Sequence, residues 1–544
     1  MKTVLVLGGY GTFGGRIAQR AAAAGFEVLV AGRSLEKARA LCAGRKRMQA
    51  IAFDRDSGLA EALAAHRPWA LVDAAGPFQG ADYKVAEAAI GAGCHYLDIA
   101  DGRDFVIGSG RLDGAAKVAG VSVVSGASSL PALSGAVIRR LAEGLDSVRE
   151  VDIALSASSR GTAGQSVTSA ILSYIGKAMA LRRSGRWTQG WGWQSLQRRN
   201  FTIAGVPTVR GRLVALADVP DLALLPGRLP GMPSVVFQAG TDLAFHNIGL
   251  WLLSWAVRLG WVERPERLAG FLSALQRRTR RLGSLRSAMD VRLFGLAGAR
   301  RVERRWTLIA ERGEGPEIPS LAVPILLEKL GDGGIAPGAG DAGPLLSLDD
   351  FAAALGGIAT RQAIEEVDHG PPLYARALGE RFEELPAAVR EMHRVFRDGG
   401  ASGRASVRRG SGLAARIVAA VMRFPPSGEH ALHVSFRERN GEEVWTRDFA
   451  GHRFASRLRV RNGRLEERFG PLSFSFNLPC DGHGLKMRIA GWRIGPVPLP
   501  LALAPRSDAS EWEEDGRFYF DVPIALPLIG LVVHYRGFLG SPEA

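Results

Sequence analysis

The stretch Thr3–Gly14 reads TVLVLGGYGTFG, and it decides the fold of the amino-terminal part. Its first five residues are aliphatic or β-branched, as in a strand that is buried on both faces of a parallel sheet. A glycine-rich turn follows at once, and the segment from Gly15 to Ala24 is predicted to be a helix that ends at Gly25. Strand, tight turn and helix in this order predict a first βα unit.

The same alternation continues along the chain. Five further strands separated by helical segments are predicted at Glu27–Ala31, Met48–Phe53, Ala70–Ala75, His95–Asp98 and Ser122–Ser125. Six strands alternating with helices are typical of an α/β fold with a doubly wound parallel Rossmann sheet. We place this domain at residues 1–145.

The turn contains the pattern Gly-x-Gly-x-x-Gly. These glycines allow a tight turn, close approach of a pyrophosphate and close packing of the helix on the strand, and the helix amino terminus attracts phosphate. The alternative is a degenerate Rossmann domain that no longer binds a dinucleotide. The residues expected to contact the cofactor here are Gly8, Gly9, Gly11, Thr12, Phe13 and Gly14.

The end of the second strand predicts which cofactor binds. NAD sites usually have Asp or Glu there, bonded to the ribose 2′-hydroxyl. This chain has Arg33 and Ser34 instead, and a guanidinium pairs well with a 2′-phosphate. NADP is therefore favoured over NAD. Asp54, after the third strand, is expected either to meet the adenine edge or to cap the next helix.

Two later loops follow strands four and five, at the same edge of the sheet. The small residues Ala75, Gly76 and Pro77 are expected to pass close to the nicotinamide half of the cofactor. Asp98 and Asp101 are candidates for acid/base catalysis, and the alternative is that they only hold their loop.

Four segments together resemble the saccharopine dehydrogenase-like (saccharopine reductase) superfamily: Gly8–Gly14, Ala74–Phe78, Cys94–Asp98 and Leu112–Ala127. The resemblance is strong over about residues 1–140 and weaker to about 365. It implies an NADP-binding Rossmann domain, a following α/β domain that covers the cofactor, and hydride transfer at a C–N bond. The loop Ser125–Leu133 keeps a proline but lacks the acidic residue of true saccharopine reductases, which disfavours saccharopine as the substrate.

Residues 146–365 are predicted to form an α+β substrate or dimerisation domain whose last helices return to the Rossmann part. Within it, 331–344 is rich in Gly, Pro and Asp and is predicted to be a mobile loop. The predicted helix Phe245–Leu259 has two tryptophans and precedes the arginine-rich stretch Arg277–Arg286. This pair suggests peripheral membrane contact, and burial of the helix in the core is the alternative.

Residues 382–544 are predicted to form a mostly antiparallel β domain. Short alternating segments are separated by Asn440-Gly441 and Asn462-Gly463, and Asn-Gly is a strong hairpin signal. We expect a barrel or half-barrel, which either holds an apolar ligand or serves as a structural module. It resembles an uncharacterised carboxy-terminal domain of some bacterial saccharopine dehydrogenase-like proteins.

The net charge of +15 comes mostly from arginine, and no nucleic-acid-binding motif accompanies it, so no nucleic acid partner is expected. The three cysteines lie far apart, which fits a reducing compartment and a cytoplasmic protein. No metal-ligand spacing, Walker A motif or Tyr-x-x-x-Lys pattern is present.

The sequence thus predicts an NADP-dependent oxidoreductase that transfers hydride to or from an unidentified small molecule. The alternatives are a non-catalytic NADP-binding protein and a lipid- or membrane-associated protein. Whether the chain forms a homodimer or touches a membrane is left open.

Overall fold

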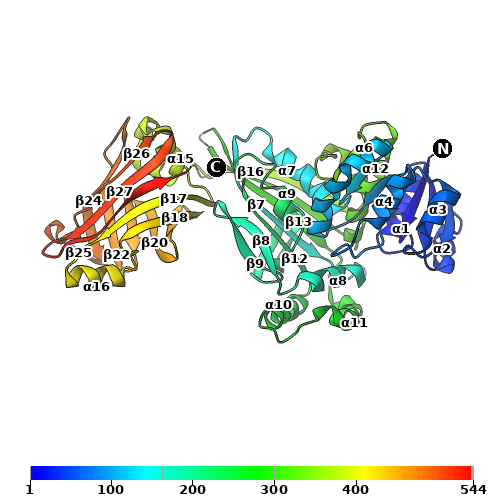
Figure 1. The fold of residues 1–544 in the computed structure, drawn as a ribbon. Helices are drawn as coiled ribbons and strands as arrows, with labels where there is room; N and C mark the ends of the chain where they lie inside the picture. Colours follow the sequence, from blue (N-terminus) through cyan, green and yellow to red (C-terminus); the bar gives the residue numbers. More distant parts are fainter. Residues whose placement is uncertain (1, 162–164, 299, 541–544) are drawn as a thin grey trace.

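In the computed structural model, residues 2–161, 165–298 and 300–540 are described. They form three blocks in a row, with the Rossmann part at one end, a mixed sheet in the middle and a β-rich part at the other end (Figure 1).

The first block is a parallel sheet of seven strands in the order β15-β6-β5-β4-β1-β2-β3. Every pairing in it is parallel, and the predicted doubly wound sheet is confirmed. The strands are β1 (Thr3–Leu7), β2 (Glu27–Gly32), β3 (Met48–Ala52), β4 (Ala70–Asp73), β5 (His95–Asp98), β6 (Ser122–Ser125) and β15 (Gly338–Asp341). The connecting helices are α1 (Gly14–Ala23), α2 (Leu35–Cys42), α3 (Leu59–His66), α4 (Lys84–Gly91), α5 (Arg103–Gly108) and α6 (Asp113–Ala119).

Strand β15 corrects the prediction of a mobile loop at 331–344. Residues 338–341 read GAGD, which has none of the β-branched or aromatic residues that mark a strand. They nevertheless pair in parallel with β6. The N–H of Gly338, the first residue of the strand, donates to the Val121 carbonyl at 3.0 Å. A neighbouring strand edge with open hydrogen-bonding groups has outweighed the local preference.

The middle block is a mixed sheet in the order β10-β11-β12-β7-β13-β14-β16, which confirms the predicted α+β architecture. Strands β7 and β12 are parallel and their neighbours antiparallel. The strands are β7 (Ser147–Ala157), β10 (Gln197–Ile203), β11 (Val206–Leu216), β12 (Ser234–Thr241), β13 (Ser287–Ala297), β14 (Arg300–Ala310) and β16 (Thr360–Asp368); a separate hairpin consists of β8 (Ala178–Arg183) and β9 (Arg186–Trp191). The helices are α7 (Ser134–Ala142), α8 (Gln165–Tyr174), α9 (Asp221–Leu224), α10 (Ala244–Arg258), α11 (Ala269–Thr279), α12 (Ala322–Gly331) and α13 (Ala352–Gly356).

After the middle sheet the chain returns to the Rossmann block. Helix α12 packs against α1. The carboxylate of Glu317, just before α12, pairs with Arg16 at 2.6 Å and with Arg20 at 2.9 Å, both on α1. These contacts hold the middle block against the glycine-rich turn.

The third block is a closed antiparallel barrel, because β22 pairs with β24 as well as with β21. The ten strands of the ring are β17 (Asp398–Arg409), β18 (Gly428–Arg439), β19 (Glu442–Phe449), β20 (His452–Arg461), β21 (Arg464–Phe469), β22 (Leu472–Asn477), β24 (Gly484–Ile494), β26 (Asp508–Glu514), β27 (Arg517–Leu526) and β28 (Gly530–Leu539). The short strands β23 (Cys480–Asp481) and β25 (Val497–Leu499) pair with β24. The predicted β-rich carboxy-terminal part is confirmed.

Helices lie at both ends of the barrel. Helices α14 (Leu373–Leu378) and α15 (Ala387–Met392) contact β20, β21, β26 and β27 and close one end. Helix α16 (Leu413–Val421) connects β17 to β18 and therefore lies at the opposite end. The antiparallel order places the β24–β25 and β27–β28 turns at the same end as α16.

Within the described ranges, no helix is both long and apolar enough to cross a membrane. No group of three or more His, Cys, Asp or Glu in those ranges is placed to hold a metal ion.

Candidate functional site

The glycine-rich turn between β1 and α1 has the geometry of a phosphate cradle. Gly8 has φ of 66°, and a Cβ there would lie 2.9 Å from the Ala74 carbonyl oxygen; a Cβ on Gly9 would lie 2.7 Å from the Val6 carbonyl oxygen. A Cβ on Gly14 would overlap the Gly8 carbonyl oxygen. Glycine is therefore required by close backbone approach.

The turn also presents unpaired donors. The N–H groups of Thr12, Phe13 and Gly14 donate to no residue in the described part of the chain. They stand at the start of α1, where an anion is stabilised by the helix dipole. The residues therefore fit a dinucleotide pyrophosphate, as the spacing predicts.

Arg33 and Ser34 follow β2 at the same edge of the sheet. Arg33 is exposed, and its side chain has no hydrogen bond or ion pair within the described ranges. The Ser34 N–H donates to the Tyr10 hydroxyl at 3.0 Å. The Ser34 hydroxyl accepts from the backbone N–H of Lys37 at the start of α2. The guanidinium is thus available to a phosphate, and Tyr10 of the glycine turn holds the loop beneath it.

Asp54 is exposed after β3, and its Oδ1 accepts from the Asp56 N–H at 2.9 Å. It closes a local turn and does not cap α3, whose N-cap is Gly58. Its neighbour Arg55 reaches across the edge and donates to the Ala75 carbonyl at 3.2 Å. Arg55 carries no motif, and the sequence prediction missed it.

The loop Ala75–Pro77 is held at its start by Asp73, whose Oδ1 accepts from the Ala75 N–H at 2.9 Å. Gly76 and Pro77 then line a cavity of about 300 Å³ between the Rossmann edge and the middle sheet. The loop therefore borders an open space at the carboxyl edge of the parallel sheet.

The two candidate catalytic carboxylates have different surroundings. Asp98 is fully buried, and its Oδ1 accepts from the N–H groups of Ala100 (2.9 Å) and Gly126 (2.8 Å) and from the Ser125 hydroxyl (3.0 Å). Burial raises its pKa to about 7, and the nearby Asp73 adds to the rise. It does not line the cavity, so its contacts are those of a group that joins the loops after β5 and β6.

Asp101 lines the cavity. Its side chain is accessible from the cavity, but protein atoms surround it, and this desolvation raises the pKa of the carboxyl. Its Oδ1 accepts from the Gln79 amide at 2.9 Å. A carboxyl with a raised pKa at the wall of a cavity is suited to proton transfer.

Two further polar groups of the wall come from the middle block. Tyr174, on α8, is half-buried, and desolvation together with Asp101 and Asp218 raises the pKa of its hydroxyl, which stays protonated. Asp218 is paired with Arg103 at 2.6 Å. Neither residue belongs to a motif, and only the docking of the middle block brings them to the Rossmann edge.

The rest of the wall is apolar. The described residues that line the cavity include no Lys, Arg or His. The lining consists mainly of small and aliphatic or aromatic residues, among them Phe78, Leu130, Leu155, Ile171, Phe237 and Met289. Such a wall offers no partner to a substrate carboxylate, and burying an unpaired charge there would cost several kcal/mol.

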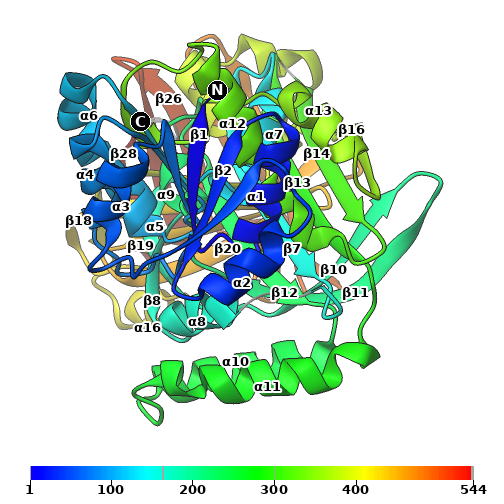
Figure 2. The ribbon, with the colours of Figure 1, turned by 90° about the vertical axis from the view of Figure 1, so that its right-hand side faces the viewer.

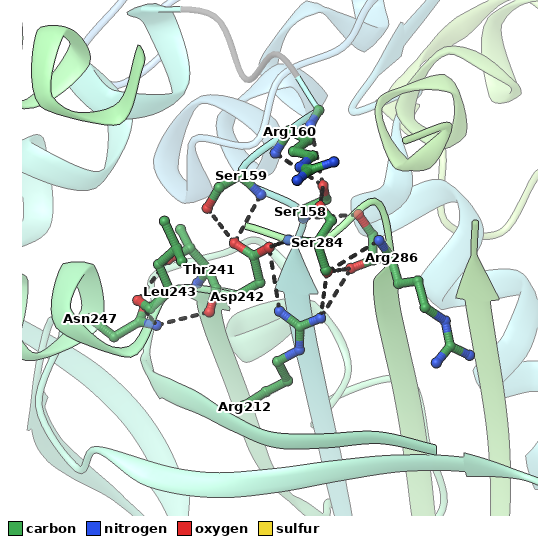
Figure 3. Close-up of polar contacts among 12 residues, drawn as sticks. Ser158, Ser159, Arg160, Arg212, Thr241, Asp242, Leu243, Asn247, Ser284 and Arg286 are labelled. Carbon is green, nitrogen blue, oxygen red and sulfur yellow. Dashed lines mark hydrogen bonds and ion pairs between the residues drawn. The ribbon is translucent and has the colours of Figure 1, made fainter. Parts of the chain in front are cut away.

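A polar network connects Ser158, Asp242 and Ser284 in the middle block (Figure 3). The Asp242 carboxylate accepts from the N–H of Ser159 at 2.9 Å, from the N–H of Ser284, and pairs with Arg212 at 3.7 Å. The Ser158 N–H donates to the Ser287 hydroxyl at 2.9 Å, and both residues line the cavity. Three loops of the middle block are thereby held together beside the cavity.

Two stretches of the chain match models of domain families. Residues 4–121 match the model of the saccharopine dehydrogenase NADP binding domain, and residues 385–539 match a domain of unknown function (DUF4166). The predicted resemblance is thus confirmed for the amino-terminal domain, and the carboxy-terminal domain is the uncharacterised one expected beside it. No curated protein matches the chain.

Solved structures show a distant likeness. The chain is similar to apo histidine-tagged saccharopine dehydrogenase (L-Glu forming) from Saccharomyces cerevisiae, with 15% identity, a TM-score of 0.45 and coverage of 67% of this chain and 100% of the other. It is also similar to an amine dehydrogenase from Mycobacterium smegmatis, with 13% identity, a TM-score of 0.33 and coverage of 64% and 96%. The Bordetella bronchiseptica enzyme WbmG in complex with NAD shows 21% identity, a TM-score of 0.15 and coverage of 18% and 36%.

The domain match and the phosphate cradle support an oxidoreductase with a nicotinamide cofactor. The domain boundaries and the roles of the individual site residues stay predictions.

Proposed function

We propose that the protein is an NADP(H)-dependent oxidoreductase whose substrate is a largely apolar small molecule. The observation that carries the proposal is the cavity beside Gly76 and Pro77. Its wall is apolar, its described lining has no cationic side chain, and a carboxyl with a raised pKa projects into it. When bound, the nicotinamide would supply or accept the hydride.

The chain's own residues would do the rest. Asp101 would give a proton to the reacting atom or take one from it, and the Tyr174 hydroxyl would donate a hydrogen bond. Asp98 would act as a positioning residue, because it holds the backbone of the loop that ends in Asp101. The apolar wall would exclude water from the reacting atoms.

The choice of NADP rests on Arg33. We expect Arg33→Asp to weaken NADPH binding by about 10-fold or more and to leave NADH binding nearly unchanged, since the lost contact is to the 2′-phosphate. Titration of cofactor fluorescence measures both affinities. Arg39→Asp is the matched control, because Arg39 is exposed on α2. Equal loss for both cofactors, or an equal effect of the control, would contradict this role.

The substrate class is tested with two probes. NADPH oxidation should be faster with decanal, an apolar aldehyde, than with oxaloacetate, a dicarboxylate. Asp101→Asn should lower kcat with decanal by about 100-fold and leave NADPH binding intact, as expected for loss of a proton donor. Turnover of oxaloacetate without turnover of decanal would reject an apolar substrate.

A second function, attachment to an anionic membrane, is favoured by helices α10 and α11. They lie together at the lower side of the molecule, apart from the sheets (Figure 2). One stripe of α10, continued by the residue that follows the helix, is apolar and exposed at helical spacing: Phe245, Ile248, Leu252, Trp255 and Leu259. Residues 258–286 carry eight arginines and two acidic residues. An apolar stripe beside arginines fits the interface of an anionic bilayer.

Flotation with vesicles tests this attachment. The purified chain should float with phosphatidylglycerol vesicles at low salt and float less at high salt, since salt screens the arginines. Leu252→Ser combined with Trp255→Ser should weaken flotation. Val118→Ser, in an exposed position on α6, is the control. Absence of flotation together with a dimer by sedimentation, lost in the double variant, would instead identify the stripe as a contact between two copies of the chain.

A further inference from the structure

The interior of the carboxy-terminal barrel contains a second cavity, of about 200 Å³, which is separate from the cofactor site. The space is far larger than a single water requires. Its wall is formed mainly by apolar side chains of the ring strands, among them Leu432, Phe449, Phe474, Ile489, Phe520 and Val532. A cavity of this kind binds hydrocarbon and does not hold ordered water well.

The few charged groups of this cavity already have partners. Among the described residues that line it, the charged ones are Arg447, Glu467 and Glu511. Arg447 pairs with Glu467 at 3.4 Å and donates to the Ser456 hydroxyl at 2.9 Å. Glu511 contacts the His393 ring at 2.6 Å. An ionised group of a ligand would find no unpaired charge here, so the part of a ligand that fits is uncharged.

Helix α16 covers one end of this cavity and is apolar on two faces. On its inner side Val418 and Met422 line the cavity. On its outer side Leu413, Ile417 and Val421 recur every four residues, and Leu413 and Val421 are 76% and 75% exposed. A helix that is apolar on both faces is normally covered on both. The outer face therefore lacks its apolar neighbour in the isolated chain.

The turns at the same end of the barrel as α16 also expose apolar side chains. The exposed apolar residues of the β24–β25 and β27–β28 regions are Ile494, Val497, Leu501, Leu503, Leu528 and Ile529. Exposed arginines, Arg416 and Arg423, lie on and just after α16. Apolar side chains at one rim, with cations among them, match an anionic lipid surface. In both views α16 lies toward the same lower side of the molecule as α10 and α11 (Figures 1 and 2).

We infer that the barrel is a lipid-binding site that takes up the hydrocarbon chain of a lipid from an anionic bilayer, against which its α16 end docks. The chain of the lipid lies in the barrel cavity, and the charged head group stays at the rim beside Arg416 and Arg423. Entry passes α16, whose inner face then contacts the lipid and whose outer face contacts the bilayer. The inference does not depend on the cofactor site.

Lipid transfer to the full-length protein tests this. The probe is a phosphatidylglycerol with a pyrene-labelled acyl chain, carried in phosphatidylglycerol vesicles; dilution of the label into the protein converts excimer to monomer emission. We expect monomer emission to rise and to saturate at about one lipid per chain, and to rise less with phosphatidylcholine vesicles, which lack the charge that attracts arginines.

Three variants separate cavity from rim. Ala509→Trp and Val418→Trp each fill the cavity from a different element, and each should reduce the amount of lipid bound at saturation by about 10-fold, since the space is lost. Leu413→Ser combined with Val421→Ser should slow transfer and leave the amount at saturation unchanged. Val118→Ser, at a position 91% exposed on α6, should change neither.

Thermal unfolding shows whether each variant is folded. If both cavity variants fold and bind lipid as the native chain does, or if the native chain takes up no labelled lipid, the inference is wrong. NADPH binding, measured on the same samples, reports separately on the proposed oxidoreductase.

Discussion

The cavity at the Rossmann edge and the cavity inside the barrel are built on opposite principles. The Rossmann edge lies where parallel strands end, and its loops supply N–H groups and an arginine that have no partner among the described residues, in the cofactor cradle, and a carboxyl with a raised pKa, that of Asp101, at the cavity wall. The cavity of the barrel is surrounded by a closed ring of strands whose backbone groups bond to each other. The comparison teaches that an open strand edge offers polar groups to a cofactor, whereas a closed ring leaves only side chains to choose the ligand.

The comparison is tested most strongly by removing a ring that lines the barrel cavity. Phe449→Ala deletes a fully buried phenyl group that contacts Phe454 and Tyr535. We expect the free energy of unfolding of the barrel to fall by about 3–5 kcal/mol, from lost burial and a new void. Urea unfolding followed by near-ultraviolet circular dichroism measures it. NADPH affinity should stay within about two-fold, because nothing in the cofactor cradle changes; a larger loss would mean that the two cavities are coupled.

The reciprocal test is Gly14→Ala. Its methyl group would overlap the Gly8 carbonyl oxygen and displace the turn that holds the free N–H groups. We expect NADPH binding to weaken by about 100-fold, through loss of donors and overpacking. Lipid transfer by the barrel should be unchanged. Gly114→Ala is the control, since a Cβ there meets nothing within 4 Å; a similar loss in the control would point to general destabilisation.

The pH dependence of stability should differ in sign between a carboxyl of the Rossmann block and a histidine of the barrel. The folded-state pKa of Asp98, about 7, lies above the ordinary value of 3.8. Between these values the folded state holds a proton that the unfolded state has lost, so stability falls as pH rises. From pH 5 to 7 the loss due to Asp98 should be about 2 kcal/mol. Asp98→Asn should remove this part of the pH dependence in urea unfolding, and an unchanged slope would contradict the buried carboxyl.

The smallest expected effect is a pH dependence of stability that arises from the barrel, and its sign is opposite to that expected for Asp98. Burial and Arg186 lower the pKa of His433 to about 4, below its ordinary 6.5. The unfolded state then binds the proton first, so stability falls as pH decreases. From pH 7 to 5.5 the loss due to His433 should be about 1 kcal/mol. Comparing the native chain with His433→Gln over this range measures it, and equal pH dependence of the two would show that His433 titrates normally.

Much of the Rossmann part could be predicted because its signals are local. The spacing of Gly9, Gly11 and Gly14 identifies the turn, because a Cβ at these positions would come too close to neighbouring backbone atoms. The alternation of strand and helix identifies the parallel sheet. In the barrel, Asn440-Gly441 and Asn462-Gly463 predicted hairpins, and all four residues have positive φ, as two-residue turns of this kind require.

The remaining features were set by contacts between residues far apart in the chain. Strand β15 exists because β6 offers it an edge, although its own residues do not favour a strand. Tyr174 and Asp218 reach the cavity only when the middle block docks on α1, and the barrel closes only when β22 meets β24.

The sequence by itself therefore determined the kind of fold at each end of the chain and the cofactor class that the first domain suits. The tertiary structure alone decided what each cavity can hold. The physical reason is that a turn or the hydrophobic periodicity of a strand depends on residues close together in the sequence. The polarity of a cavity wall depends on side chains that only packing brings together.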